Sequence, residues 1–473
     1  MKIIIHKLGW VILCLFLSLP MIAQIGISNS GQAPDPSAML DVRSTEKGFL
    51  TPRMTANERA AIASPATGLL VFQTTDPVGF YYNQGSADEP DWVKLGGEGD
   101  IKDLQTRIPI DSVAFFASYN GTYANYVITE PGSYYLTDTF SIRQSGGNGI
   151  VIDADNVTLD MNGFAIYGDG PFNVNNGSTP GGNPLSDPGG SGSGILVDGE
   201  QFNITIRDGY LNSWQDDGIH APDVRNSIFQ NLSFRYNGQN GMTLGDQNLI
   251  DNCVSFWNVL DGIHVGVANN LINCRGENNG ESCIQADSSS QFIACVAANN
   301  FGDGITAGPG SLALGCSILD NDGNGMLAAR DCNMIKVVSH NNGQDGIKAD
   351  ENSVVRECVV SNNEASGIHL IGENGGILNN VSYRNEDHGI FCSNTTMTDI
   401  KVDGNSMIDN QTTGLTMISA GGLVVRNVAA GQLTTSSYTL HPDTNRGPVV
   451  NVAAVGDIST VPNSDHPLAN FIY

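Results

Sequence analysis

Residues 260–280 read LDGIHVGVANNLINCRGENNG, and the same pattern returns along the second half of the chain. The first and third residues after Gly262 are apolar, Ile263 and Val265, and the residue between them is polar. An alternation of period two predicts a short strand that buries one face. The glycine recurs every 21 residues, at Gly241, Gly262, Gly304, Gly325, Gly346 and Gly367, with Cys283 in the remaining place. The sequence therefore predicts a solenoid in which each repeat is one coil.

A column of asparagines supports the solenoid. It contains Asn237, Asn258, Asn279, Asn300, Asn321, Asn342, Asn363 and Asn385, spaced 21 residues apart six times and then 22. Adjacent coils lie about 4.8 Å apart, so each side-chain amide can donate a hydrogen bond to the next. Asparagine also tolerates the left-handed backbone conformation that a sharp turn needs. We expect about ten to twelve coils between Gly149 and Gly414.

The cysteines follow the same period. Cys253, Cys274, Cys295 and Cys316 step by 21 residues, Val337 takes the next place, and Cys358 resumes the column. Because this column also accepts valine, we predict that its cysteines are buried, free thiols that pack as small apolar side chains. A disulfide framework is the alternative for a chain with eight cysteines after its leader.

The N-terminus and the charge indicate an exported protein. Residues 1–23 combine Lys2 and Lys7 with an apolar run that is too short to span a membrane, which predicts a cleaved signal peptide. No later stretch is apolar enough for a transmembrane segment, so we expect a secreted or cell-surface protein. The formal net charge of −27 argues against nucleic acid and anionic membranes as partners. A polyanionic glycan would need bridging cations or a local basic patch.

Residues 24–95 contain LDVRSTEKGFLTPRMTANERAAIASPATGLLVFQTT, followed by GFYYN. We predict short strands around the turn DPVG and a brief helix that Thr55 caps with Glu58 as its partner. The string resembles an N-terminal module of exported bacterial proteins that is related to phage tail-fibre segments. The resemblance implies attachment or display, with homo-oligomerisation through this module. Residues 96–107 are a polar linker.

Residues 108–430 open with ITEPGSYYLTDTF and GIVIDADNVTLDMNGFAIYGDG. These strings resemble the first coils of bacterial right-handed parallel β-helix proteins of the pectin-lyase-like superfamily. We therefore expect an all-β fold, a single-stranded right-handed parallel β-helix with a small N-terminal β-rich module. Residues 168–193 form a Gly-, Pro- and Asn-rich insertion, which in a solenoid often borders a binding surface. Residues 431–473 break the period and resemble the terminal cap of the same proteins.

Two rows of side chains are candidates for function. The residues before each glycine are Asp217, Asn240, Asp261, Ser282, Asp303, Asn324, Asp345, Ser366 and His388, and the outward residues of the strands are His220, Thr243, His264, Gln285, Thr306, Leu327, Lys348 and His369. Asp, Asn and Ser before glycine are turn formers that bond their own backbone, which is the structural alternative. Carboxylates and imidazoles on one surface suit acid–base chemistry, so the catalytic candidates are Asp216, Asp217, Asp261, His220 and His264.

Aromatic side chains occur on successive coils next to these carboxylates. Sugar rings stack on aromatic faces, so the substrate-binding candidates are Trp214, Tyr236, Trp257, Lys348 and His369. The alternative is that the tryptophans cover turns and the histidines are solvated. We predict no cofactor, because the Asp residues recur every second coil, about 10 Å apart, which is too far for one calcium ion.

The family resemblance adds little about chemistry. QDDG at 215–218 resembles the paired Asp of polygalacturonases, and GIHVG at 262–266 resembles their His motif, but the Gly-His-Gly and Arg-Ile-Lys strings are absent. The separation of the Asp residues also suits two carboxylates of an inverting glycosidase. We predict a surface-displayed protein that binds polysaccharide along its side, with enzymatic activity left open. The alternatives are a polysaccharide hydrolase, less readily a lyase or epimerase, and a structural tail-fibre-like rod or adhesin.

Overall fold

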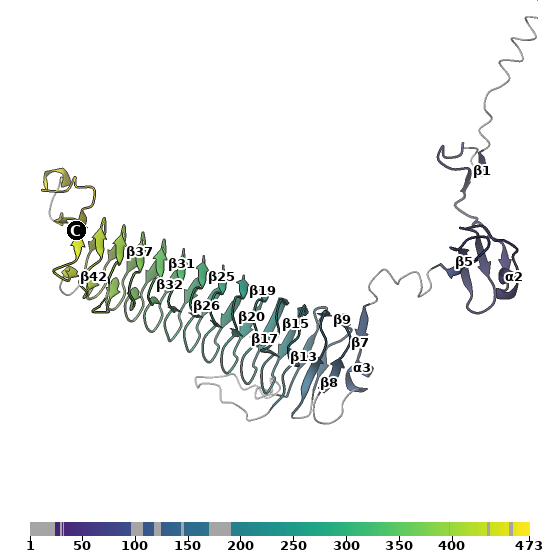
Figure 1. Ribbon diagram of the computed structural model, residues 1–473, viewed down its shortest axis with the longest axis horizontal. Helices are drawn as coiled ribbons and strands as arrows, with labels where there is room; N and C mark the ends of the chain where they lie inside the picture. The colour runs from purple at the N-terminus through teal and green to yellow at the C-terminus, as the bar shows by residue number, and fades with distance from the viewer. Residues whose placement is uncertain are drawn as a thin grey trace, which may run out of the picture. The chain divides into compact units, whose positions relative to one another are not determined.

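The computed structural model describes residues 24–28, 31, 33–95, 107–117, 124–142, 146–169, 191–396, 398–432, 436–453 and 457–473. The expected signal peptide, nearly all of the linker and most of the 168–193 insertion lie outside these residues. The chain divides into two compact units, Met1–Thr106 and Arg107–Tyr473, which are described separately (Figure 1).

The first unit is small and rich in β-structure. A parallel pair joins β1 (Ile25–Ser28) to β2 (Leu40–Arg43), and a four-stranded sheet has the order β3 (Arg53–Met54), β4 (Leu70–Gln73), β5 (Gly79–Asn83), β6 (Trp92–Lys94). The helix α2 (Ala56–Ala60) begins with a capping box in which Thr55 and Glu58 bond each other's backbone N–H groups. The predicted helix cap and the two predicted strands are confirmed.

The second unit is a solenoid of stacked parallel strands, seen as rows of arrows in Figure 1. One sheet takes a single strand from each coil and has 14 strands among the described residues. They are β8 (Ala124–Ile128), β11 (Asn148–Ile152), β14 (Ile195–Val197), β16 (Ile219–Ala221), β18 (Met242–Leu244), β21 (Ile263–Val265), β24 (Ile284–Ala286), β27 (Ile305–Ala307), β30 (Met326–Ala328), β33 (Ile347–Ala349), β36 (Ile368–Leu370), β39 (Ile390–Cys392), β42 (Thr413–Met417) and β45 (Ser436–Leu440). The twelve strands from β11 to β42 agree with the predicted number of coils.

A second sheet takes two short strands from most coils. In one coil these are β19 (Leu249–Asp251) and β20 (Val254–Phe256), and the chain bends between them at Asn252, whose φ is 52°. Upstream, the two strands of a coil merge into one of eight residues, as in β15 (Thr205–Asn212) and β17 (Ile228–Arg235). Each coil therefore encloses a narrow core between the two sheets.

Asparagines form the predicted ladder inside the turn that leads back to the 14-stranded sheet. Asn300 is buried, donates from Nδ2 to Asn321 Oδ1 at 2.8 Å, and accepts from Asn279 Nδ2 at 3.0 Å. The same side-chain bond joins successive members from Asn237 to Asn410. The ladder satisfies buried amides while it fixes the register of the coils.

The cysteines are buried and free, as predicted. Burial raises the pKa of Cys253 to about 12, so its thiol stays protonated and unreactive at neutral pH. The column does not end with Cys358, however. The Cys358 N–H donates to Asn380 Oδ1 at 2.9 Å, and Asn380, Asn405, Asn427 and Asn470 continue as a second asparagine ladder that the sequence analysis did not foresee.

Both ends of the solenoid are covered. At the first end, α3 (Ser112–Ala117) places Phe115 in the core, where its ring stacks on Phe140 at 4.2 Å. At the other end, β48 (Asn470–Ile472) pairs in parallel with β44 (Val428–Ala430). β45 adds a last strand to the 14-stranded sheet from within the expected C-terminal cap. None of the helices in the described residues is long and apolar enough to cross a membrane.

Candidate functional site

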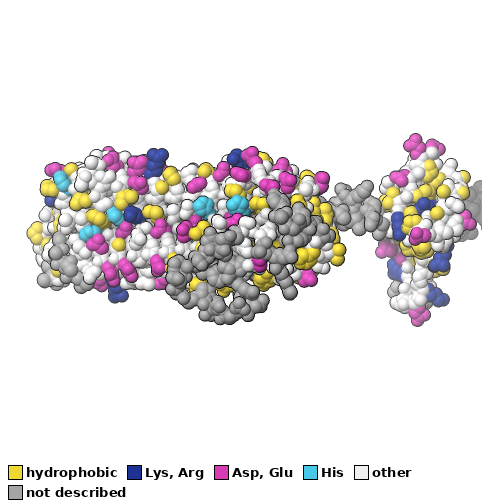
Figure 2. All heavy atoms as spheres, turned by 90° about the horizontal axis from the view of Figure 1, so that it is seen from below, with side chains coloured by type: hydrophobic (Ala, Val, Ile, Leu, Met, Phe, Trp, Pro, Cys, Tyr) yellow, Lys and Arg dark blue, Asp and Glu magenta, His cyan; other side chains and the backbone are white. Residues whose placement is uncertain are grey.

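The middle residues of the strands in the 14-stranded sheet form one outward row. Each lies half-buried between two buried neighbours, and each pairs in register with the next coil. The row is the predicted one, from His220 to His369, and we call it the outward row. Figure 2 shows one long side of the solenoid, where histidine side chains gather in two groups beside acidic ones.

The residues before each glycine form a ladder between coils. Asp217 Oδ1 accepts from the Asn240 N–H at 2.8 Å, and Asn240 Oδ1 accepts from the Asp261 N–H at 2.9 Å. Asp261 Oδ1 in turn accepts from the Ser282 N–H at 2.9 Å. The expectation that these side chains bond their own backbone is wrong, because the backbone group within reach belongs to the next coil. Asp217 and Asp261 are only 1% and 3% exposed.

The second oxygen of these carboxylates binds a histidine of the outward row. Asp217 Oδ2 lies 2.7 Å from His220 Nδ1, and Asp261 Oδ2 lies 3.0 Å from His264 Nδ1. The hydrogen bond to the carboxylate raises the pKa of both imidazoles above 6.5, against the opposing effect of burial. Because the histidine side chains are 37% and 35% exposed, they, and not the carboxylates, face solvent.

A third pair, at His369, is built differently. Its own coil has Ser366 before the glycine, and His369 Nδ1 instead reaches Asp345 of the preceding coil at 2.7 Å. His369 Nε2 lies 2.8 Å from the hydroxyl of Ser393, which directly follows β39. The ring stacks on Phe391 at 4.8 Å, and Lys348 precedes His369 in the outward row. The two predicted binding residues Lys348 and His369 are thus neighbours. Asp345 was named in the row before each glycine but not as a catalytic candidate, and Ser393 was missed.

Asp216 and Glu281 lie beside the first two pairs. Backbone hydrogen bonds run from Gln239 to Asp216, from Leu260 to Gln239 and from Glu281 to Leu260, so Asp216 and Glu281 share one column. Burial raises the pKa of Glu281, and the charge of Asp261 adds to this effect. Glu281 was missed, and its place in the column of Asp216 is the signal that could have found it.

The three candidate aromatic residues do not share one column. The Trp214 N–H donates to Asn237 Oδ1 at 3.1 Å, so Trp214 stands at the ladder position, and it is 2% exposed in the core. Tyr236 and Trp257 stand one position earlier in their coils, half-buried, with φ of 59° and 56°. The assignment of Trp214 to a sugar-binding surface is therefore wrong. Equivalent positions of these two coils are 23 residues apart, as in the pairing of Asn212 with Arg235, whereas the next coils step by 21. Ser213 is therefore the counterpart of Tyr236, and Trp214 stands one residue later, where the side chain turns inward.

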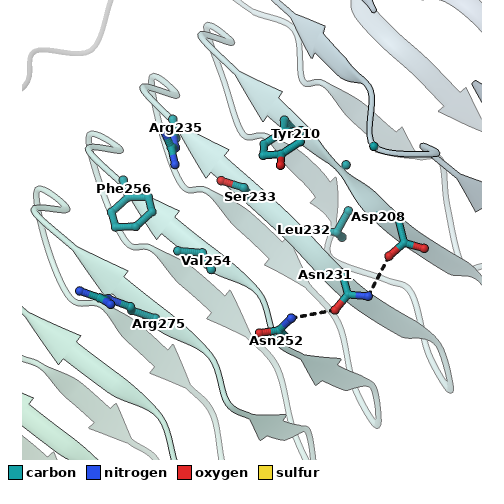
Figure 3. A pocket seen from close by; sticks show the side chains of 12 residues that line it. Asp208, Tyr210, Asn231, Leu232, Ser233, Arg235, Asn252, Val254, Phe256 and Arg275 are labelled. Carbon is teal, nitrogen blue, oxygen red and sulfur yellow. Dashed lines mark hydrogen bonds between the residues drawn. The ribbon is translucent and has the colours of Figure 1, made fainter. Parts of the chain in front are cut away.

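A groove lies on the other sheet, away from the outward row, along β15, β17, β20 and β23 (Arg275–Glu277). Its volume is 630 Å³, and its lining includes Tyr210, Arg235, Phe256 and Arg275. The Arg235 guanidinium lies over the Phe256 ring, 5.0 Å from its centre, and Figure 3 shows these side chains on neighbouring strands. The groove combines two arginines with aromatic surface, but Asp208 also lines it and Arg275 pairs with Glu277, so its charges are largely balanced.

Sequence families agree with this architecture. The family described as "Right handed beta helix region" matches residues 193–339 and 307–432. These two overlapping matches together cover 240 of the 473 residues. The chain belongs to the right-handed β-helix family. Residues 26–108 match the "Phage tail like trimerisation region", in line with the resemblance of the first unit to tail-fibre segments. No curated protein matches the sequence.

Solved structures that are similar to this β-helix protein differ among themselves in function. The A-module of a mannuronan C-5 epimerase from Azotobacter vinelandii has 14% identity and a TM-score of 0.35, over 73% of this chain and 89% of that one. A periplasmic alginate epimerase has 12% identity and a TM-score of 0.40, over 70% of this chain and 83% of that one. PfbA, a surface adhesin of Streptococcus pneumoniae, has 10% identity and a TM-score of 0.31, over 73% of this chain and 90% of that one. At such identities and TM-scores these likenesses say nothing about which residues of this chain act.

The geometry of the β-helix limits the chemistry of the outward row. In the described part of the chain, no group of three or more His, Cys, Asp or Glu side chains could hold a metal ion. Asp217 and Asp261 have both oxygens engaged and are almost fully buried, so they do not fit the pair of accessible carboxylates of an inverting glycosidase. They can take part in proton transfer only through His220 and His264.

Proposed function

We propose that this β-helix protein binds polysaccharide along the outward row, over the coils from Asp217 to Glu281. The observation that carries the proposal is the backbone of Tyr236 and Trp257. Both hold the left-handed conformation at a position where later coils have Asn278, Asn299 and Asp320. A bulky residue is uncommon in that conformation and costs backbone energy, whereas asparagine adopts it readily. Aromatic side chains at this place therefore favour a function in binding.

Hydrogen-bonding groups accompany the two aromatic residues. Each imidazole at His220 and His264 is held through Nδ1, and more than a third of each side chain is exposed. Asp216 and Glu281 add carboxyl groups in one column, Asp216 on the coil of His220 and Glu281 on the coil after that of His264. Sugar recognition combines stacking on aromatic faces with fixed polar groups of this kind. The coils that carry these residues follow the Gly-, Pro- and Asn-rich stretch in the sequence.

A second candidate function is proton-transfer chemistry on the bound glycan. Glu281, whose pKa is raised by burial, is close enough to His264 for the imidazole charge to act on it. A carboxyl group and an imidazole with raised pKa values are suited to donate protons to a leaving oxygen. The reaction would be hydrolysis or, less readily, elimination or epimerisation.

The first unit supplies attachment and display in this proposal. Its match to a phage tail-like trimerisation region favours an assembly of three chains. The expected signal peptide is the reason to place this assembly at the cell surface. Three copies would present three outward rows, which raises the avidity for a repeating glycan without any new contact. The native mass of the full chain in solution decides whether measured affinities are read per chain or per assembly.

Binding of the full chain to a panel of neutral and acidic polysaccharides, by titration calorimetry, tests the proposal. Trp257→Ala should weaken binding by about 1 to 3 kcal/mol, which is roughly 5- to 150-fold in Kd. The matched control is Tyr210→Ala, which removes a 45% exposed aromatic residue from the groove on the other sheet. Loss of affinity in the Tyr210 variant alone would move the site to that groove and overturn the proposal.

Reducing ends and unsaturated products, measured on the same panel, separate binding from catalysis. If wild type turns over a glycan, Glu281→Gln should abolish turnover and leave affinity nearly unchanged, because it removes an acid and little ground-state contact. A wild type that binds but never turns over supports a binding module. A wild type that binds none of the panel supports the structural rod.

A further inference from the structure

The contacts around His369 join three side chains from three successive coils. Asp345 precedes β33, His369 is the middle residue of β36, and Ser393 follows β39. His369 Nδ1 lies 2.7 Å from Asp345 Oδ2, and His369 Nε2 lies 2.8 Å from Ser393 Oγ. A nucleophile bonded to one ring nitrogen and an orienting carboxylate bonded to the other is the arrangement of nucleophilic acyl transfer.

We propose that Asp345, His369 and Ser393 form a hydrolytic centre that removes ester-linked acyl groups from a polysaccharide. The proposal adds an activity at coils outside the binding site proposed above. The polysaccharide as carrier of the ester rests on the proposed function, whereas the ester hydrolysis itself does not. Small activated esters can therefore test the centre without any knowledge of the glycan.

The carboxylate is fixed well enough to orient the imidazole. Asp345 is 6% exposed, and its Oδ1 accepts from the Ser366 N–H at 3.0 Å, which leaves Oδ2 for His369. A buried carboxylate next to Nδ1 favours the tautomer with the proton on Nδ1, so that Nε2 accepts the Ser393 hydroxyl proton. The Phe391 ring, stacked on His369 at an interplanar angle of 26°, shields the imidazole from water on one face.

The repeat itself does not require a serine at this place. Ser393 lies two residues after Phe391, the residue that pairs with His369 on the next coil. The equivalent positions beside the other two Asp–His pairs are Gly245, two residues after Thr243, and Asp287, two residues after Gln285. The serine therefore coincides with the one described pair in which the histidine reaches back to the preceding coil.

The residue after Ser393 supplies a further polar group. Asn394 Oδ1 accepts from the Thr396 N–H at 3.0 Å and from its hydroxyl at 2.8 Å, which orients the side-chain amide. An amide donor next to the nucleophile is a common source of oxyanion stabilisation in acyl transfer. Ser393 and Asn394 are half-buried, so part of each residue is open to solvent.

The reaction balances with water as the only co-reactant. Ser393 Oγ attacks the ester carbonyl carbon while His369 Nε2 takes the hydroxyl proton, and the resulting imidazolium is stabilised by Asp345. The carbon–oxygen bond to the sugar then breaks, and the imidazolium returns the proton to the departing sugar oxygen. Water, deprotonated by His369, attacks the acyl-serine, releases the carboxylic acid and restores the Ser393 hydroxyl.

Two measurements on the full-length protein test the centre. A fluorophosphonate probe should modify Ser393, located by peptide mass spectrometry, and p-nitrophenyl acetate should be hydrolysed. Ser393→Ala should abolish the modification and lower the hydrolysis rate by about 100-fold or more, since removal of one member disables the group. Asp345→Asn should lower the rate and change its pH profile. Ser317→Ala, which alters a half-buried serine on the other sheet, is the matched control and should behave as wild type.

Wild-type protein that hydrolyses the ester no faster than Ser393→Ala, or that reacts with the probe elsewhere only, overturns the proposal. The probe measurement on wild type needs no variant to fold. Glycan affinity is measured in parallel. Loss of binding in Trp257→Ala with normal ester hydrolysis would show that hydrolysis does not depend on glycan binding, and it would support the hydrolytic centre. Normal binding without modification of Ser393 sinks the centre and leaves the binding site.

Discussion

Two turns of the solenoid each contain a tryptophan, with opposite outcomes. Trp214 occupies the ladder position of its turn, donates from Nε1 to the Ile166 carbonyl at 3.3 Å and lies in the core. Trp257 stands one residue before the ladder residue Asn258, in the left-handed conformation, half-buried at the surface. The comparison teaches that the column, and not the residue type, decides whether an aromatic side chain stabilises the fold or is available to a ligand.

The core can hold Trp214 because glycines surround it. A Cβ atom on Gly149 or on Gly168 would stand 2.9 Å from a ring carbon of the Trp214 indole. A Cβ atom on Gly194 would stand 2.8 Å from Nε1 of the same ring. These contacts are closer than real Cβ atoms accept, so the three glycines and the indole fit as one unit. None of the glycines in the described residues has Trp257 among the atoms nearest to its Cβ position, so Trp257 can be replaced with less structural consequence.

The largest expected effect follows from this contrast. Trp214→Ala should lower the free energy of unfolding by about 3 to 5 kcal/mol, because it leaves a cavity in a close-packed core. Trp257→Ala should change it by less than about 1 kcal/mol. Chemical denaturation of both variants gives the two values. Similar losses in both would show that the two turns are equivalent and that Trp257 is a core residue.

A second, smaller effect separates the inner ladder from the outward row. Asn300→Ala should cost about 1 to 3 kcal/mol, since Asn279 and Asn321 then lose buried partners. Thr306→Ala should cost about 0.5 kcal/mol, because its contacts to Asp303 and Ser282 are long, at 3.4 and 3.3 Å. Denaturation midpoints of the two single variants provide the test. Equal midpoints would mean that the ladder does not stabilise the fold.

What the sequence predicts follows from the period. Residues that contact each other in one column of adjacent coils are 21 residues apart in the sequence. The strands, the Asn237 ladder and the outward row could therefore all be predicted. The second ladder was not, because its steps from Cys358 to Asn380 and on to Asn405 are 22 and 25 residues and its residue type changes. A ladder of fixed spacing is easier to find than one in coils of varying length.

Contacts between different columns are harder still. His369 meets Asp345 and Ser393, each 24 residues away, because its ring reaches one coil back along Nδ1 and one coil forward along Nε2. The pattern in the sequence contains no repeat at that distance, and only side-chain geometry connects the three residues. The inward turn of Trp214 was missed for a related reason, because its coil has 23 residues where the next one has 21.

The smallest expected effect is a pH dependence of opposite sign at histidines that bond a carboxylate and at His388. The carboxylate bonds raise the pKa of His220 and His264 above 6.5, so their contribution to stability is full below about pH 6.5 and is lost as pH rises through the raised values. Burial lowers the pKa of His388, so its contribution is present above about pH 6.5 and is lost as pH falls through the lowered value. Partial exposure keeps the first two contributions under about 1 kcal/mol each.

Thermal unfolding between pH 5 and 8.5 tests these signs. For the double variant His220→Gln with His264→Gln, the deficit in Tm against wild type should be greatest at acid pH and shrink toward alkaline pH. For His388→Gln, wild type should instead lose its advantage toward acid pH, because protonation of the half-buried ring is unfavourable. A deficit of the double variant that does not change with pH would mean that the two imidazoles are not charged in the folded state. The outward row would then offer neutral hydrogen-bonding groups to its ligand, and acid catalysis by His264 would lose its basis.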